Sequence, residues 1–453
     1  MTSTDTGADA PTRLRRSVTG PLLFLFILGD VLGAGVYALV GELSAEAGGM
    51  VWLPLLVALG MALLTAASYA ELVTKYPQAG GSAVYAQRAF RRPVVSFLVG
   101  FSMLAAGVTS AAGLSLAFAG DYLGVFLDVP PIPAAIVFLA LVAALNARGI
   151  KESMRANLVM TAVEVSGLLL VVVLGAMVLG RGEGDPARLL ELPADTTAAA
   201  ATLGGALIAF YSFVGFETSA NVAEEVRDVR RVYPTALFAA LVTAGVVYLL
   251  VGLVAPAVVA PEDLQASSGP LLEVVRAAGG VPLALFSAVA LIAVANGALL
   301  TMIMSSRLAY GMADEGLLPA VLGRVLPNRR TPVVAIVVTT LVAMVLTATG
   351  SLVDLASTVV LLLLLVFLST NLAVLVLRRD RVDHPHFRAW TPLPVLAIGT
   401  CLGLLTQQEP RHWLLAGVLL AVGVVLYLLT RRSSRPAATH AAGSTDAADE
   451  RRA

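Results

Sequence analysis

The sequence predicts an all-α polytopic membrane protein, and three observations carry that prediction. The 453 residues are 58% hydrophobic and 13% charged, with a mean hydropathy of +0.86, whereas soluble domains carry about 25% charged residues. Apolar runs recur along the whole chain, and each is long enough, at about 20 residues, to cross a bilayer as a helix. Transmembrane barrel strands would instead give shorter segments of alternating polarity.

We expect twelve transmembrane helices, an even number that puts both termini on one side. The spans are predicted at 18–40, 50–73, 94–122, 131–147, 156–180, 201–225, 234–258, 281–306, 332–349, 352–377, 390–406 and 411–430. They divide the chain into an N-terminal segment (1–17), a first repeat of five spans (18–180), an extracellular loop (181–200), a second repeat of five (201–377), two peripheral spans (378–430) and a tail (431–453). The tail is rich in Ser, Ala, Asp and Arg, which is typical of disorder.

The positive charges predict the orientation of the spans. Net charge is zero, yet 24 of the 30 Lys and Arg residues lie in segments on one side of the predicted membrane. The outer loops hold only Arg181, Arg188, Arg276 and Arg411. Because cytoplasmic loops carry the excess of Lys and Arg, we expect a multi-pass protein of the plasma membrane with both termini in the cytoplasm.

The sequence lacks the residues that several kinds of functional site require. The single cysteine, Cys401, excludes an intrachain disulfide, and the four histidines fall in predicted loops or the tail. We therefore expect no metal site, no nucleotide-binding loop and no organic cofactor. No nucleic acid and no obligatory protein partner are expected either.

The first span contains "GDVLGAGVYALVG", which is unusual for a helix in a membrane. Each glycine costs a helix about 1 kcal/mol relative to alanine, and Gly33 and Gly35 flank the single residue Ala34. Close packing of small residues is one explanation. The alternative is that the helix is interrupted here.

The sixth span favours the interruption. It reads "LIAFYSFVGFETSANVAEEVRD" and places Gly215 and Glu217 among aromatic residues. An ionisable group in a span is costly unless it faces protein or water. Spans one and six open the two five-span halves and run in opposite directions, and such paired glycine interruptions mark the midplane site of secondary transporters.

Two opened helices predict how a solute binds. A half-helix that starts after Gly33, Ala34 and Gly35 offers free N–H groups and a positive dipole end to a carboxylate. Freed carbonyls between Phe210 and Phe213 accept from an ammonium group. A small zwitterion, an amino acid or a related amine, satisfies both ends.

Four stretches together resemble the amino acid–polyamine–organocation superfamily, specifically its amino acid permeases. They are "GAGVYALVG", "YAELVTKYPQAGGSAVYAQRAF", "YSFVGFETSANVAEEVRDVRRVYP" and "ANGALLTMIMSSRLAYGMADEGLLP", in this order over residues 18–430. The resemblance implies a five-plus-five inverted repeat in which helices one and six are discontinuous. Spans one, two, six and seven would move against spans three, four, eight and nine, with the last two spans peripheral.

The resemblance also implies a set of site residues. Substrate contacts are expected at Gly33, Ala34, Gly35, Phe210, Tyr211, Phe213 and Gly215. Tyr211 stands where relatives have an aromatic gate in the sixth span, so we expect it to close over the solute.

Four polar residues are candidates for gating or coupling: Asp30, Glu164, Glu217 and Asn296. Some proton-linked relatives carry a lysine in the fifth span where this chain has Glu164, and a carboxylate cannot replace that ammonium. Because burial disfavours a charged carboxylate, Glu164 is a candidate proton carrier, or alternatively a cation ligand. Glu217 is either a coupling residue or a structural carboxyl bonded to Ser212. Asp30 is a gate partner or a cap, and Asn296 has the alternative of only joining helices.

The sequence therefore predicts a secondary active transporter for amino acids or related amines, with proton-coupled symport favoured. Exchange or sodium coupling is the alternative. A channel or an amine-sensing receptor is the alternative from another class, although no segment is long enough for a signalling domain. An enzyme is not expected, since no cluster of His, Asp or Cys lies at membrane depth.

Overall fold

The computed structural model describes residues 18–33, 35–78, 80–148, 153–194, 196–325 and 331–433. The regular secondary structure of these residues is helical. The one β-bridge recorded among them joins Val18 to Val226. Of the sequence predictions, Ala34, the N-terminal segment up to residue 17 and the tail beyond residue 433 lie outside the described residues.

Among the described residues, ten helical segments are long and apolar enough to cross a membrane. They are α1 (Gly20–Leu32) with α2 (Gly35–Ala47), α3 (Trp52–Lys75), α5 (Pro93–Ala119) with α6 (Asp121–Gly124), α7 (Pro131–Arg148), α8 (Ser153–Gly180, apolar from Leu158), α9 (Ala198–Ser212) with η2 (Phe216–Glu225), α10 (Val229–Val258), α13 (Leu283–Asp314), α15 (Leu352–Leu377) and α17 (Pro410–Ser433, apolar to Thr430). The prediction of an all-helical, multi-pass membrane protein is confirmed.

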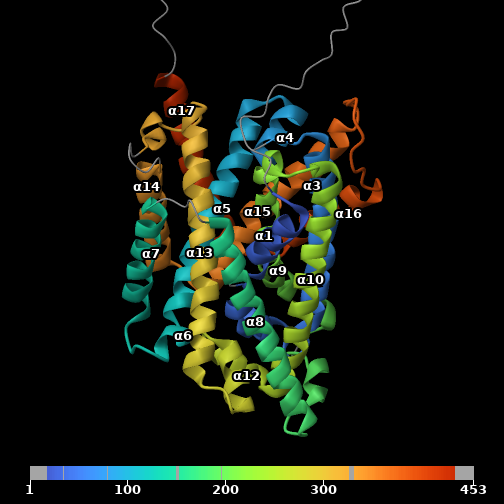
Figure 1. The fold of residues 1–453 in the computed structure, drawn as a ribbon, viewed down its shortest axis with the longest axis vertical. Coiled ribbons are helices and arrows are strands. Elements are labelled where there is room, and N and C mark those ends of the chain that lie inside the picture. Colours follow the sequence, from blue (N-terminus) through green and yellow to red (C-terminus); the bar gives the residue numbers. More distant parts are fainter. Residues whose placement is uncertain are drawn as a thin grey trace, which may run out of the picture.

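Two further predicted spans are shorter helices. They are α14 (Val333–Thr349) and α16 (Pro392–Thr406), both apolar but below the length used for a span. The remaining elements are α4 (Gly81–Phe90), η1 (Pro186–Leu190), α11 (Pro261–Ala266), α12 (Pro270–Ala278) and η3 (Ala320–Gly323). In Figure 1, α4 lies at the top of the helices, and α6 and α12 lie at the bottom. We call these the α4 end and the α12 end.

The helices pack in two groups joined by α15. In the first group α1 and α3 pack on α10, and α2 and α3 pack on α9. In the second group α5 packs on α13, α7 and α14. Helix α15 contacts α5 on one side and α9 and α3 on the other. Figure 1 shows α1 and α9 inside the assembly, where they are surrounded by longer helices.

A clasp of three residues, the Glu71 clasp, closes the α4 end of α3. Glu71 is 2% exposed, and its two carboxylate oxygens accept from Arg378 Nε (3.0 Å) and Nη2 (2.8 Å). The backbone N–H of Ala389 donates to the same carboxylate at 2.9 Å. Lys75 strengthens the link by donating to the carbonyl oxygens of Leu377 and Asp380, each at 2.6 Å. The segment after α15 is thereby fixed to α3.

Candidate functional site

A cavity of about 800 Å³ lies where α1/α2 and α9/η2 are interrupted. Gly33 and Gly35 line it from the first interruption, and Ser212, Val214 and Gly215 line it from the second. Helices α5, α13 and α15 supply the facing wall, and α4 and η2 contribute residues toward the α4 end. The cavity therefore meets both interrupted spans at once.

The two interruptions are in direct contact through Gly35. A Cβ atom on Gly35 would lie 2.8 Å from the Cα and 3.0 Å from the Oγ of Ser212. Since real Cβ contacts are never this close to backbone atoms, only glycine allows α2 to begin against the end of α9. The glycine in the sequence motif is thus explained by a close approach of backbones.

The second interruption is shaped by hydrogen bonds and by Gly215. The N–H groups of Phe213 and Val214 donate to the carbonyls of Phe210 and Tyr211, each at 3.1 Å. Gly215 then adopts φ of +125°, a conformation that residues with a side chain rarely reach. The chain continues as the 3₁₀ helix η2, so the two halves of this span differ in helix type.

Two carboxyl groups flank Gly215. Glu217, 3% exposed, accepts from the Gly215 N–H with its Oε2 at 2.9 Å. Asp30, in the last turn of α1, accepts through Oδ2 from the Thr218 hydroxyl. Both acids line the cavity. The suggested bond between Glu217 and Ser212 is absent, because the Ser212 hydroxyl has no partner among the described residues.

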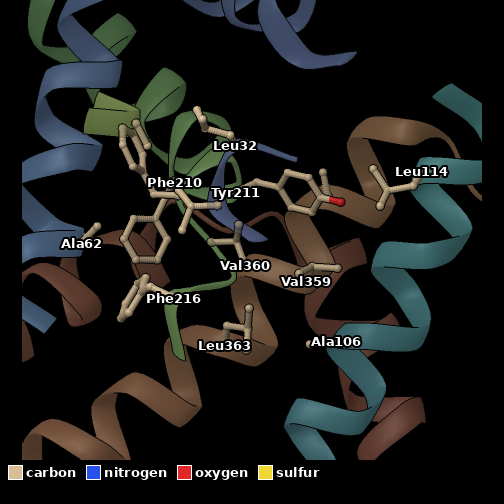
Figure 2. Packing of buried hydrophobic residues seen from close by; sticks show 14 of the residues in the cluster. Leu32, Ala62, Ala106, Leu114, Phe210, Tyr211, Phe216, Val359, Val360 and Leu363 are labelled. Carbon is tan, nitrogen blue, oxygen red and sulfur yellow. The ribbon is translucent and has the colours of Figure 1, made fainter. Parts of the chain in front are cut away.

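Tyr211 lines the cavity together with Ser110 and Leu114 of α5. Its hydroxyl and that of Ser110 on α5 are 2.9 Å apart. Figure 2 shows the ring of Tyr211 extending from α9 toward Leu114 of α5, with Val359 of α15 below it. This hydroxyl contact links α9 to α5 at the cavity.

The α4 end of the cavity is lined by charged and amide side chains of α4, η2, α13 and the segments just before α4 and just after α13. They are Gln78, Gln87, Arg88, Asn221, Glu225, Arg307 and Glu315. Arg88 donates to Gln78 Oε1 at 2.6 Å and lies 4.7 Å from the ring centre of Tyr76. The cavity thus runs from the interruptions toward the α4 end.

Glu164 and Asn296 form a second polar pair outside the cavity lining. Asn296 Nδ2 of α13 donates to Glu164 Oε1 of α8 at 2.9 Å. Glu164 is 0% exposed, and its Oε2 has no hydrogen-bond partner in the described part of the chain. The Tyr37 hydroxyl of α2 donates to the Glu164 backbone carbonyl at 2.7 Å, which joins this pair to the first interrupted span.

The structure separates the predicted site residues into two sets. Gly33, Gly35, Tyr211, Gly215, Asp30 and Glu217 line the cavity, whereas Phe210, Phe213, Glu164 and Asn296 are not among its lining residues. The Phe210 ring packs 5.9 Å from that of Phe367, and the Phe213 ring packs 5.3 Å from that of Tyr248. Figure 2 shows Phe210 and Phe216 on the side of Ala62, opposite to Tyr211.

Sequence reasoning missed Ser110 and Thr218, which bond to Tyr211 and Asp30. It also missed Thr301 as part of the cavity wall on α13. A weak signal was present for Thr218, because it follows Gly215 by three residues and so returns to the same side of a 3₁₀ turn. Ser110 carried no such signal.

Membrane-length helices that enclose a cavity between two interrupted spans define a multi-pass membrane transporter rather than an enzyme. The chain matches the family model described as amino acid permease over residues 22–425, and it belongs to that family.

Relatives of the chain are transporters by name. It is 26% identical to the methylthioribose transporter of Bacillus subtilis (strain 168), over 92% of this chain and 94% of that protein. It is 25% identical to the branched-chain amino acid permease BcaP of the same organism, over 93% of this chain and 94% of that one. It is 31% identical to the vacuolar cationic amino acid transporter 2 of Arabidopsis thaliana, over 81% of this chain and 60% of that protein.

Proposed function

We propose that this protein is a secondary active transporter that moves amino acids or related amines across the plasma membrane by alternating access. The observation that carries the proposal is the contact of two interrupted membrane-length helices at one cavity. Family membership supports the substrate class. The relatives' names cover a sulfur-containing sugar, branched-chain amino acids and cationic amino acids, so they do not select one side chain.

The solute is held mainly by backbone groups. The start of α2, at Gly33, Ala34 and Gly35, supplies N–H donors and the positive end of a helix dipole for a carboxylate. The end of α9 and the turn through Gly215 supply carbonyl oxygens for an ammonium group. The carbonyls of Phe210 and Tyr211 already accept from Phe213 and Val214, and the Gly215 carbonyl accepts from Thr218. The ammonium-binding carbonyls are therefore those between them, from Ser212 to Val214.

Alternating access needs a cavity that opens to one side at a time. The lining at the α4 end is polar, and in this proposal the Tyr211–Ser110 contact closes the other side. The excess of Lys and Arg supports a cytoplasmic location of the α4 end, together with both termini. These features support an inward-facing state, from which the transporter returns by breaking the Tyr211 contact.

The architecture proposed for this cycle has twelve spans. Spans one to five and six to ten form a five-plus-five inverted repeat, with α14 as the ninth span, and α16 and α17 as the peripheral pair. The group of α1/α2, α3, α9/η2 and α10 moves against the group of α5, α7, α13 and α14. The separate packing of these two groups supports this division.

Coupling to protons is proposed through the buried acids. Glu217 contacts the second interruption and Asp30 the first, while Glu164 with Asn296 joins α8 to α13. Carboxyl groups inside a membrane protein mark proton and ion pathways. Sodium coupling and exchange are the competing modes.

The test is uptake of each of the twenty radiolabelled amino acids into proteoliposomes that contain the purified protein. An inward proton gradient is expected to drive at least one amino acid above its equilibrium level. Accumulation driven only by sodium would assign sodium coupling, and uptake only against internal amino acid would assign exchange. Absence of both uptake and exchange for all amino acids and for their decarboxylated amines would overturn the proposal.

A further inference from the structure

Asp30 presents its carboxyl group to the cavity beside the two interruptions. It belongs to the last turn of α1, lines the cavity and is only partly buried. The Thr218 hydroxyl holds its Oδ2 from the side of η2. Glu217, by comparison, is 3% exposed and binds the Gly215 N–H. Both acids line the cavity, and Asp30 is the more exposed of the two.

Asp30 also faces the second interruption directly. A Cβ atom on Gly215 would lie 2.7 Å from the Asp30 carbonyl oxygen and 3.2 Å from its carboxyl carbon. The glycine therefore lets the turn of the second span approach the end of α1. A positive group bound by the carbonyls of that turn lies beside the Asp30 carboxylate.

The charges around the cavity are distributed unevenly. Near the interruptions its ionisable lining residues are Asp30 and Glu217, both acidic. The basic lining residues, Arg88 and Arg307, lie on α4 and toward the end of α13, where Glu225 and Glu315 accompany them. Across the described residues, no Lys, Arg or His lines the cavity beside Gly33, Gly35 or Gly215. The deep end of the cavity is thus complementary to a cation.

We propose that Asp30 is a specificity-determining residue that binds the ammonium group of the solute, so that the site accepts amino acids and their decarboxylated amines but excludes the corresponding acids that lack nitrogen. This inference rests on the proposed function and names the chemical group that the site selects. A carboxylate on the solute meets only the dipole of α2, whereas the ammonium meets a full negative charge. Since the ammonium and Asp30 are both charged, whereas the solute carboxylate faces neutral N–H groups, the ammonium dominates recognition.

The experiment uses three ligands with one carbon skeleton. The labelled probe is the amino acid that the wild-type protein takes up fastest, and the competitors are its decarboxylated amine and its deaminated acid. For the wild type, the amine is expected to compete strongly and the acid only weakly, at concentrations that still give a measurable inhibition. Asp30→Asn is expected to weaken competition by the amino acid and the amine by about tenfold or more, the loss typical of a hydrogen bond to a charged group, without weakening the acid.

The matched control is Glu183→Gln, which removes a carboxylate that is 57% exposed and pairs with Arg181 outside the cavity. It is expected to leave the ratio of amine to acid inhibition unchanged. Thr218→Val is a second test that keeps the Asp30 charge. It removes the hydroxyl that orients the carboxylate and is expected to lower the same ratio about threefold.

The outcomes separate this inference from the proposed function. Equal weakening of all three ligands by Asp30→Asn would assign a structural or gating role and overturn the inference, as would an unchanged ratio. If Asp30→Asn does not fold, an unchanged ratio in Thr218→Val overturns it. Wild-type protein that binds neither amino acids nor amines overturns the proposed function as well.

Discussion

Two buried carboxyl groups of this protein lie in surroundings of opposite kind. Glu71 in α3 is held by both nitrogens of a guanidinium fork and by a backbone N–H from the segment after α15. Glu164 in α8 accepts from the Asn296 amide, and its second oxygen has no partner among the described residues. Both side chains are almost completely buried, at 2% and 0% exposure.

The difference teaches which acid is structural and which is available for function. A buried carboxylate is stable when a cation and donors satisfy its oxygens, as they do in the Glu71 clasp. A buried acid with an unsatisfied oxygen and no cationic partner is stable when it carries a proton or binds a cation. Such unsatisfied buried groups are rare and call for an explanation. For Glu164, the proposed proton coupling supplies one.

The largest expected effect is the loss of the Glu71 clasp in Arg378→Gln. Breaking one side of a buried ion pair leaves an uncompensated charge and costs about 3–5 kcal/mol. Thermal melting of the protein purified in detergent, followed by loss of monodisperse material, measures it. We expect a large decrease in melting temperature without a change in the order of substrate preference.

Arg411→Gln is the matched control for that variant. Arg411 also pairs with acids, Asp354 at 3.0 Å and Glu409 at 2.7 Å, but its side chain is 58% exposed. Exposed ion pairs contribute about 0–1 kcal/mol, so the melting temperature should change little. Equal losses in the two variants would contradict a special role for the clasp.

The second prediction concerns Glu164→Gln. The glutamine carbonyl still accepts from Asn296 Nδ2, but the side chain can no longer exchange a proton or carry a charge. We expect accumulation driven by a proton gradient to be lost, while exchange of internal for external substrate persists. The melting temperature should be unchanged or higher, since no buried charge remains.

The readout for Glu164→Gln is the ratio of gradient-driven uptake to exchange in the same vesicles. Asn296→Ala serves as a comparison, because it removes the donor and keeps the acid. If Glu164→Gln accumulates substrate as the wild type does, then Glu164 is a structural residue, as Glu71 is.

The sequence predicted the interruptions because glycine is costly in a helix, and this cost is visible in a single chain. Gly35 and Gly215 are explained by a close contact and by a positive φ, both of which a sequence motif can signal. The all-helical class followed from apolar length alone. These features depend on local composition.

The directions of side chains around the interruptions could not be predicted. A span that is apolar on all sides has no polar face to show how it is oriented, so the sequence placed Phe210 and Phe213 at the site together with Tyr211. In the structure the two phenylalanine rings pack against other aromatic rings, whereas the Tyr211 hydroxyl contacts that of Ser110. In the same way, Glu71 was an unremarked acid in a loop motif until Arg378, 307 positions away, was placed beside it.

The smallest effect is expected from removing the contact between Tyr211 and Ser110, because both of these hydroxyl groups are uncharged. Tyr211→Phe keeps the ring over the cavity and removes only the hydroxyl, which costs about 0.5–1.5 kcal/mol for a neutral hydrogen bond. We expect the balance of states to shift toward outward opening, with a two- to tenfold change in the apparent affinity for external substrate.

A double-mutant cycle with Ser110→Ala isolates this contact from any other effect of the tyrosine. Because the two hydroxyls share one bond, the double variant should behave as either single variant does, and the coupling energy should equal the single loss. External substrate affinity in right-side-out vesicles gives the measurement for all four proteins. Additive losses would mean that Tyr211 and Ser110 act separately, and the closure of the cavity would then depend on the apolar packing of Leu114 and Val359 rather than on a hydroxyl bond.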